Sequence, residues 1–246
     1  MRISDSMVKT GELLFRWRSY LPFLLLPIFV VSFFGVKYPA GEHSAGLLWE
    51  IGCFLISLLG FTIRCLTVGT IPSGTSGRNT TRQAARVLNT TGMYSLVRHP
   101  LYLGNYFVLL GISLFPRAWY LPIIASVFFL LYYERIVVCE EKYLEERFGD
   151  EFKSWADRTP AFFPRSFRSY VRPNVPFSWR TVLRREGSGL FSLGMAFWIM
   201  DILEDLFAGR TLTFDPVWTF IMAGAFLLFI VLRYLRKAGF LVVSNR

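Results

Sequence analysis

Residues 91–106, TGMYSLVRHPLYLGNY, run from a polar connection into an apolar segment, and the rest of the chain is arranged around them. About thirty residues further on, the chain carries a second polar cluster, CEEKYL, at 139–144. Ionisable groups at the end of a membrane helix are costly to bury, so their presence indicates a functional site. Because Tyr, Arg and His also mark helix ends at the headgroup level, an interfacial anchor is the alternative.

The composition is that of a membrane protein. Of the 246 residues, 53% are hydrophobic and 17% aromatic, and the mean hydropathy is +0.42. The 2 histidines and 3 cysteines include no CxxC pair, so we expect neither a disulfide framework nor a metal site. We expect no cleavable signal peptide, because the first apolar run lacks a small-residue cleavage site.

Six apolar runs predict about six transmembrane helices in an all-α, polytopic membrane bundle. The runs are 21–36, 47–71, 101–115, 119–133, 189–207 and 217–232. If both tails and the long connections 72–100 and 134–187 share one side, that side holds 23 of the 27 Lys and Arg residues. Lys37, Arg117 and Arg210 fall on the other side, and Arg64 lies inside a run. The positive-inside rule then places both termini and both long connections in the cytoplasm.

The net charge of +10 is explained mainly by this topology, and a six-span protein is a poor nucleic-acid partner. The segment 159–187 alternates Pro and aromatic residues with six arginines: Arg165, Arg168, Arg172, Arg180, Arg184 and Arg185. We expect this segment to lie on an anionic lipid leaflet.

Beyond the fourth run, residues 133–157 are predicted to form one amphipathic helix at the cytoplasmic face. Its apolar residues recur at helical spacing on one face: Val137, Leu144, Phe148, Phe152 and Trp155. Glu140 falls on this same face and therefore needs a partner, because an unpaired buried carboxylate is strongly unfavourable. Glu141 lies about 100° further round the helix, on what we expect to be a solvated side with Glu134 and Glu145.

The chemistry of the two clusters suits a zwitterionic ligand that carries a nucleoside. A carboxylate such as that of Glu140 accepts from vicinal hydroxyls or an ammonium group, whereas Arg98 and His99 fit a carboxylate. Tyr94 and Tyr102 offer aromatic faces to an adenine or a sulfonium.

Two further residues of the first cluster have a structural meaning. Pro100 suits the first turn of a helix, where its missing N–H would have no partner in any case. Gly104, one turn later, lets another helix or a ligand approach the backbone.

These residues resemble the isoprenylcysteine carboxyl methyltransferase and phospholipid methyltransferase superfamily. The resemblance is carried by Gly92-x-Tyr94-x3-Arg98-His99-Pro100-x-Tyr102-x-Gly104, then by Glu140-Glu141-x2-Leu144-x3-Phe148-Gly149-x2-Phe152 and Pro160. It implies a cytoplasmic pocket for S-adenosylmethionine contacted by Val87, Leu88, Tyr94, His99, Pro100, Tyr102 and Glu140. It also implies a methyltransferase core at 47–164, after an N-terminal tail and helix at 1–46 and before a basic linker and hairpin at 165–246.

The chain also departs from the family. The isoprenylcysteine enzymes have a substrate-contacting arginine four residues before the cofactor glutamate, where this chain has Ile136 with Arg135 beside it. We therefore take Arg98 and Arg135 as the catalytic candidates, and Arg135 and Asn105 as the substrate candidates. The final hairpin lies outside the shared core, and together these departures weigh against a prenylated protein substrate.

Transfer of a methyl group from a sulfonium mainly requires positioning and a dry site. An anionic acceptor needs no general base, and a basic inner face would attract it. We therefore expect O-methylation of a lipid phosphate or carboxylate in a bacterial inner membrane, as some relatives methylate a lipid A phosphate. The alternatives are methylation of an isoprenylcysteine carboxyl or a phospholipid amine, a non-enzymatic lipid-binding role, and an NADPH-dependent membrane reductase. Such reductases share Arg-His-Pro but have Asn and an acidic residue where this chain has Leu101 and Asn105.

Overall fold

The computed structural model describes residues 3–18, 20–34, 43–72, 85–207 and 214–241, and all regular structure within them is helical. Lys37 and Arg210, which entered the charge count, lie outside the described residues. The helices are α1 (Ile3–Trp17), η1 (Leu21–Leu25), α2 (Leu26–Ser32), α3 (His43–Gly69), η2 (Gly92–Ser95), α4 (Pro100–Leu114), α5 (Tyr120–Phe148), α6 (Asp150–Ala156), η3 (Phe167–Ser169), α7 (Trp179–Phe207) and α8 (Pro216–Lys237). The predicted all-α fold is confirmed.

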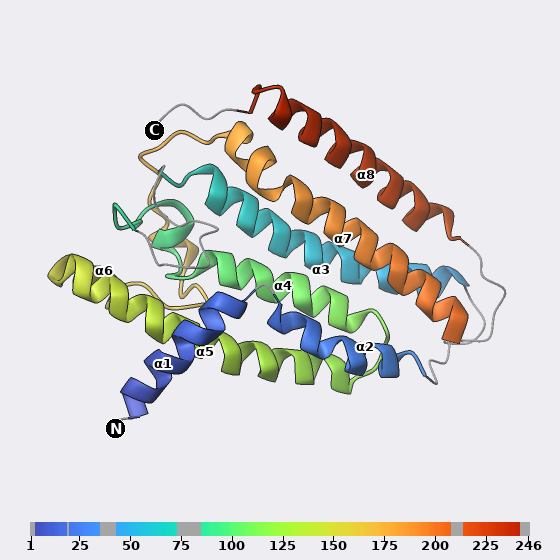
Figure 1. Cartoon of the computed structure of the whole chain (residues 1–246), viewed down its shortest axis with the longest axis horizontal. Helices are drawn as coiled ribbons and strands as arrows, with labels where there is room; N and C mark the ends of the chain where they lie inside the picture. Colours follow the sequence, from blue (N-terminus) through green and yellow to red (C-terminus); the bar gives the residue numbers. More distant parts are fainter. Residues whose placement is uncertain (1–2, 19, 35–42, 73–84, 208–213, 242–246) are drawn as a thin grey trace.

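The axes of the long helices are roughly aligned, and α3 lies between α4 and α7 (Figure 1). Helix α4 packs on one side of α3 and α7 on another, while α5 packs on α4 and α8 on α7. Helix α1 lies along the second half of α5, and α6 follows the end of α5. As a result α3 ends, α4 and α7 begin and α5 passes into α6 at one end of the bundle. This shared end is called the motif end below.

Each of the six predicted apolar runs lies mainly in helices within the described residues, but their ability to span a membrane differs. By length and composition α3, α5 and α8 can each cross a membrane, and a fourth span results if α1 and η1–α2 count as one broken span. Helix α4 is apolar but has only 15 residues. Helix α7 begins ten residues before the predicted run and so takes in Glu186. The count of six spans therefore stays a prediction.

Small residues let α3 and α4 pack with their backbones close together. A Cβ on Gly60 would collide with the carbonyl oxygen of Gly104, and one on Gly111 would collide with that of Cys53. The Ser57 hydroxyl donates to the carbonyl of Val108 over 3.1 Å. Close approach of this kind is typical of helices that associate inside a membrane. The expectation that Gly104 admits a neighbouring helix is confirmed.

The C-terminal hairpin shares the main apolar core instead of forming a core of its own. This cluster joins the residue after α2 with residues of α3, the α4–α5 connection, α7 and α8: Phe33, Cys53, Phe115, Leu193, Phe197, Met200 and Trp218. Ser178, just before α7, donates its backbone N–H to the carbonyl of Gly69 over 2.8 Å and so ties the two helix ends together.

The predicted single helix over 133–157 is wrong at one residue. Helix α5 ends at Phe148, Gly149 has a φ of +53°, and α6 then begins at Asp150. A positive φ of this kind suits glycine and ends a regular helix. The predicted apolar face nevertheless holds across the break, since Phe152 and Trp155 of α6 pack with Leu144 and Phe148 of α5.

At the end of the bundle opposite the motif end, a buried ionic group joins three elements. Arg117, between α4 and α5, donates to the carboxylates of Glu204 in α7 and Glu50 in α3. Trp218 of α8 donates its indole N–H to Glu50 over 2.8 Å. The side chains of Glu50 and Glu204 are only 5% and 2% exposed. We call these four residues the Arg117 cluster.

Candidate active site

The 91–106 segment is held by the loop that follows α6. Gly92, with a φ of +63°, starts the short helix η2, and its N–H donates to the carbonyl of Val171 over 2.8 Å. The N–H groups of Arg98 and His99 donate to the carbonyls of Pro160 and Ala161, over 2.8 and 3.1 Å. Backbone N–H groups shielded from water need a partner, and this loop supplies it. The segment therefore enters α4 in one fixed conformation.

At the start of α4, the His99 ring lies between the two glutamates of α5. Its Nε2 lies 2.9 Å from Oε1 of Glu141, and its Nδ1 lies 3.6 Å from Oε2 of Glu140. The Tyr102 hydroxyl donates to Oε1 of Glu140 over 2.7 Å, and the Tyr102 ring stacks on His99 with centroids 5.7 Å apart. His99 is 7% exposed, whereas the two carboxylates are 23% and 24% exposed. The two sequence clusters thus meet, as predicted. We call His99, Tyr102, Glu140 and Glu141 the His99 cluster.

Glu141 does not lie on a solvated side, so that expectation is wrong. Its carboxylate accepts from Arg98 Nε over 2.7 Å as well as contacting His99. The α5–α4 approach explains the difference: both Glu140 and Glu141 face the start of α4, which helical phase alone does not reveal. Glu145, one turn further, is 50% exposed and pairs with Lys153, which is 57% exposed.

Arg98 is bonded to the protein at most of its donors. Besides Glu141, its Nη1 donates to the carbonyls of Ala156 and Thr159, each over 2.8 Å. These contacts tie the end of α6 to the start of α4. The geometry thus gives Arg98 a positioning role, and the predicted catalytic role stays a prediction.

The remaining cofactor candidates lie around this cluster. Pro100 is buried at the first position of α4, as expected for a helix start. Leu88 packs with Phe152 and Trp155, and Tyr94 packs at the edge of that group and accepts from the Trp155 indole through its carbonyl. The Val87 side chain is 54% exposed. Tyr94 is therefore linked to the His99 cluster indirectly, since α6 contacts both Tyr94 and Arg98. Direct contact of Val87 with a cofactor stays a prediction.

The two substrate candidates lie in different places. Arg135 is on the side of α5 that packs on α1, where Nη1 lies 3.5 Å from the Thr10 hydroxyl. Asn105 lies one turn into α4, accepts from Arg64 and donates to the Tyr133 hydroxyl over 3.0 Å. The ring centroids of Tyr133 and Tyr102 are 4.5 Å apart, so Asn105 is linked to the His99 cluster through Tyr133. Arg135 instead contacts α1.

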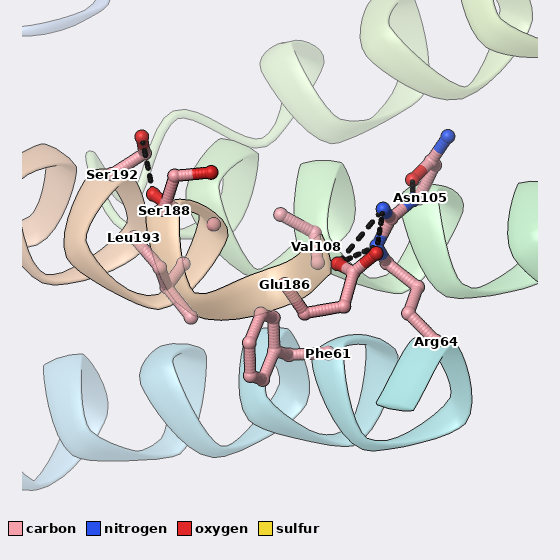
Figure 2. Close-up of a pocket in the computed structure, with 9 residues that line it drawn as sticks. Phe61, Arg64, Asn105, Val108, Glu186, Ser188, Ser192 and Leu193 are labelled. Atoms are coloured by element: carbon pink, nitrogen blue, oxygen red, sulfur yellow. Dashed lines mark hydrogen bonds and ion pairs between the residues drawn. The ribbon is translucent and has the colours of Figure 1, made fainter. Parts of the chain in front are cut away.

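The sequence analysis did not identify a second polar group beside Asn105. Arg64 of α3 binds Glu186 of α7 through Nε and Nη2, over 2.8 to 3.0 Å, and these side chains border a cavity of about 300 Å³ (Figure 2). The cavity is lined by three helices: Phe61 and Arg64 of α3, Asn105 and Val108 of α4, and Glu186, Ser188, Gly189, Ser192 and Leu193 of α7. The position of Arg64 inside an apolar run was the one available signal, because such a charge needs a partner.

Comparison with known proteins agrees with this geometry. Residues 51–151, which carry most of α3 and all of α4 and α5, match the family model of phospholipid methyltransferases. This match supports the superfamily for the part of the chain that carries both motifs. The chain is also 28% identical over 83 residues to the protein-S-isoprenylcysteine O-methyltransferase of Schizosaccharomyces pombe, covering 34% of this chain and 35% of that protein. The resemblance to the superfamily expected from the motifs is confirmed.

Two more similar relatives have names of another kind. The chain is 38% identical over 139 residues to the nickel-cobalt-cadmium resistance protein NccN of Alcaligenes xylosoxydans xylosoxydans, and 33% identical over 151 residues to the cobalt-zinc-cadmium resistance protein CzcN of Cupriavidus metallidurans. These matches cover 55% and 61% of this chain, and the chain spans 62% of the length of each relative. No solved structure gives a significant match. Within the described residues, no group of three or more His, Cys, Asp or Glu side chains is arranged to hold a metal ion.

Proposed function

We propose that the protein is an S-adenosylmethionine-dependent methyltransferase that O-methylates an anionic headgroup of a membrane lipid. The observation that carries this proposal is the meeting of His99 and Tyr102 with Glu140, about forty residues apart in the sequence, within a core of the methyltransferase superfamily. The charge asymmetry supports placing this motif end at the cytoplasmic face of a bacterial inner membrane.

The residues of the cluster fit the proposed cofactor. One Glu140 oxygen accepts from Tyr102, while the other lies 3.6 Å from the nearest His99 nitrogen, so the carboxylate keeps lone pairs for a hydroxyl or ammonium donor. Tyr102 and His99 present stacked rings that suit an adenine or a sulfonium. Glu141 and Arg98 hold His99 in place from the other side, which would keep this surface preorganised.

S-adenosylmethionine supplies a methyl group on a positively charged sulfur, which leaves as a neutral thioether. An anionic acceptor oxygen forms the new C–O bond as the C–S bond breaks, so that no proton has to be moved. The protein then has to align the acceptor and exclude water. The closely packed loop 160–162 over His99 is suited to both tasks.

The names of the relatives support an anionic acceptor. NccN and CzcN are named for resistance to divalent metals. Divalent cations accumulate at membrane surfaces that carry negative charge, and each O-methylation removes one such charge. We therefore propose that methylation lowers metal binding at the lipid surface.

The cofactor proposal is tested by ligand-induced thermal stabilisation of the purified protein. S-adenosylhomocysteine should stabilise the native state and NADPH should not, because a ligand at 100 times its Kd adds about 2.7 kcal/mol. Glu140→Gln should abolish this stabilisation. The matched control Glu145→Gln makes the same change on the exposed side of α5 and should preserve it. Stabilisation by NADPH instead would identify a reductase and contradict the proposal.

The acceptor is tested with labelled S-adenosylmethionine and a panel of lipids. We expect label in lipids that carry a free phosphate or carboxylate. Label confined to phosphatidylethanolamine would show amine methylation, and label in a farnesylated cysteine peptide alone would show an isoprenylcysteine enzyme. Either result would overturn the proposed acceptor without affecting the proposed cofactor.

A further inference from the structure

The cavity between α3, α4 and α7 has features of a binding site that are separate from the His99 cluster. Its polar side consists of the Arg64–Glu186 pair and the Asn105 amide (Figure 2). Glu186 is 4% exposed, and it belongs to α7, which lies outside the matched core at 51–151. Charged side chains within a membrane bundle usually face its interior or a polar cavity, and these two border the cavity.

Glycines keep this space open. The stem of Arg64 lies over Gly104, where a Cβ would approach Arg64 Cγ to 2.6 Å. A Cβ on Gly189 would lie 3.2 Å from the Phe61 ring and 3.7 Å from a Glu186 oxygen. Side chains at either position would therefore displace Arg64 or reduce the cavity.

The electrostatics of the cavity select a class of ligand. The Arg64 charge is balanced by Glu186 in a two-pronged pair, so the polar side offers hydrogen bonds without a net charge. Ser188 and Ser192 add hydroxyls on α7, and Phe61 and Val108 supply apolar surface. A neutral polar wall of donors and acceptors suits a group with several hydroxyls better than an ammonium or a bare phosphate.

One face of α7 gives such a ligand a direction. Ser188, Ser192, Met195 and Ile199 follow one another at spacings of four, three and four, and so share a face of the helix. Ser192, Met195 and Ile199 are all exposed. The face therefore changes from hydroxyls beside the cavity to apolar side chains further from the motif end, which matches the change from headgroup to acyl chain in a lipid.

The cavity is also connected to the proposed cofactor site. Arg64 donates to Asn105, Asn105 donates to the Tyr133 hydroxyl, and the Tyr133 ring lies against that of Tyr102. Tyr102 in turn donates to Glu140. A headgroup held at Arg64 and Asn105 would thus have its next polar atoms beside the His99 cluster.

We propose that this cavity binds the hydroxyl-bearing headgroup, glycerol or sugar, of a membrane lipid, with its acyl chains along Met195 and Ile199. Where this lipid is the methyl acceptor, the inference rests on the proposed function, but the binding itself does not. The C-terminal hairpin then supplies the acceptor side of the site through α7.

Binding is measured by native mass spectrometry of the protein released from nanodiscs with equal parts phosphatidylethanolamine, phosphatidylglycerol and monoglucosyldiacylglycerol. Enrichment of phosphatidylglycerol over the bulk mixture identifies a glycerol headgroup, and enrichment of the glucolipid identifies a sugar headgroup. Either result supports the proposal. Enrichment of phosphatidylethanolamine alone, or retention in bulk proportions, overturns it.

A variant that fills the cavity links binding to this place. Gly189→Leu should reduce the retained lipid at least tenfold, and the control Gly224→Leu should not, because a Cβ on Gly224 of α8 meets nothing within 4 Å. Stabilisation by S-adenosylhomocysteine should be the same in both variants, which also shows that both fold. Unchanged lipid retention in Gly189→Leu overturns the proposed site.

The same measurements separate the two proposals. A wild-type protein that S-adenosylhomocysteine does not stabilise, but that retains a hydroxyl-bearing lipid lost in Gly189→Leu, contradicts the proposed methyltransferase cofactor and supports the lipid site. The reverse pattern contradicts the lipid site alone.

Discussion

The two ends of α3 each carry a glutamate–arginine interaction, and the two differ in what surrounds them. In the Arg117 cluster, one arginine lies between two glutamates whose side chains are 5% and 2% exposed, with the Trp218 indole donating to one of them. At the motif end, Arg64 is 25% exposed, pairs with one glutamate and borders a cavity of about 300 Å³. Both arrangements join helices, and the second also borders a cavity that a ligand can enter. The glutamates at both ends are similarly buried, so the cavity beside Arg64, more than burial or the ion pair itself, makes this pair a candidate site.

The largest expected effect tests the structural side of this comparison. Arg117→Leu leaves Glu50 and Glu204 buried without their cation, and removing one partner of a buried pair costs about 3–5 kcal/mol. We expect a large fall in the unfolding temperature of the protein in detergent. Arg180→Leu, at an exposed position of α7, should change stability by less than about 0.5 kcal/mol. Equal unfolding temperatures for the two variants would show that the Arg117 cluster does not hold the bundle together.

An intermediate effect tests the cavity side. Arg64→Leu should cost about 1–3 kcal/mol, less than Arg117→Leu, because a quarter of the Arg64 side chain is exposed and its partner Glu186 is single. Transfer of label to lipid should fall at least tenfold while S-adenosylhomocysteine still stabilises the protein. Arg64→Lys keeps the charge but not the two-pronged geometry, so its activity should lie between that of the wild-type protein and that of Arg64→Leu. Full activity in Arg64→Leu would remove the distinction between the two arginines.

The smallest expected effect tests the link between the cavity and the His99 cluster. Tyr133→Phe removes the hydroxyl that accepts from Asn105 and should cost about 1 kcal/mol of stability. In a double-mutant cycle for methyl transfer, Tyr133→Phe and Arg64→Leu should be non-additive by more than about 0.5 kcal/mol, because both act through Asn105. Tyr133→Phe and Arg117→Leu share no contact and should be additive. Additivity in both cycles would show that Asn105 does not couple the cavity to the cluster.

The sequence predicts the helices and the meeting of the two motifs well, for a physical reason. Apolar runs long enough to leave water must form helices in lipid, because every backbone group is then bonded within its own segment. The charge bias places 98–102 and 139–144 at the same end, and a carboxylate on an apolar face requires a partner nearby. Glu140 could therefore be assigned to the site before its contacts were known.

The parts that were missed depend on distances between segments far apart in the chain. Helical phase shows which way Glu141 points relative to Glu140, but not that α4 begins between the two. Glu186 and Arg64 are separated by 122 residues, and only the packing of α7 against α3 brings them together. The end of α5 at Gly149 could have been predicted, since a glycine after a long helix often adopts a positive φ.

Helix α7, outside the matched segment, contributes Glu186, Ser188 and Ser192 to the lining of the cavity. The lining residues outside α7 belong to α3 and α4, inside the matched segment. If both proposals hold, α3, α4 and α5 carry the donor site, and α7 adds its own side chains to the choice of acceptor. Exchange of the last third of the chain between homologues would transplant lipid preference onto an unchanged methylation apparatus. Evolution could diversify such proteins in the same way, one hairpin at a time.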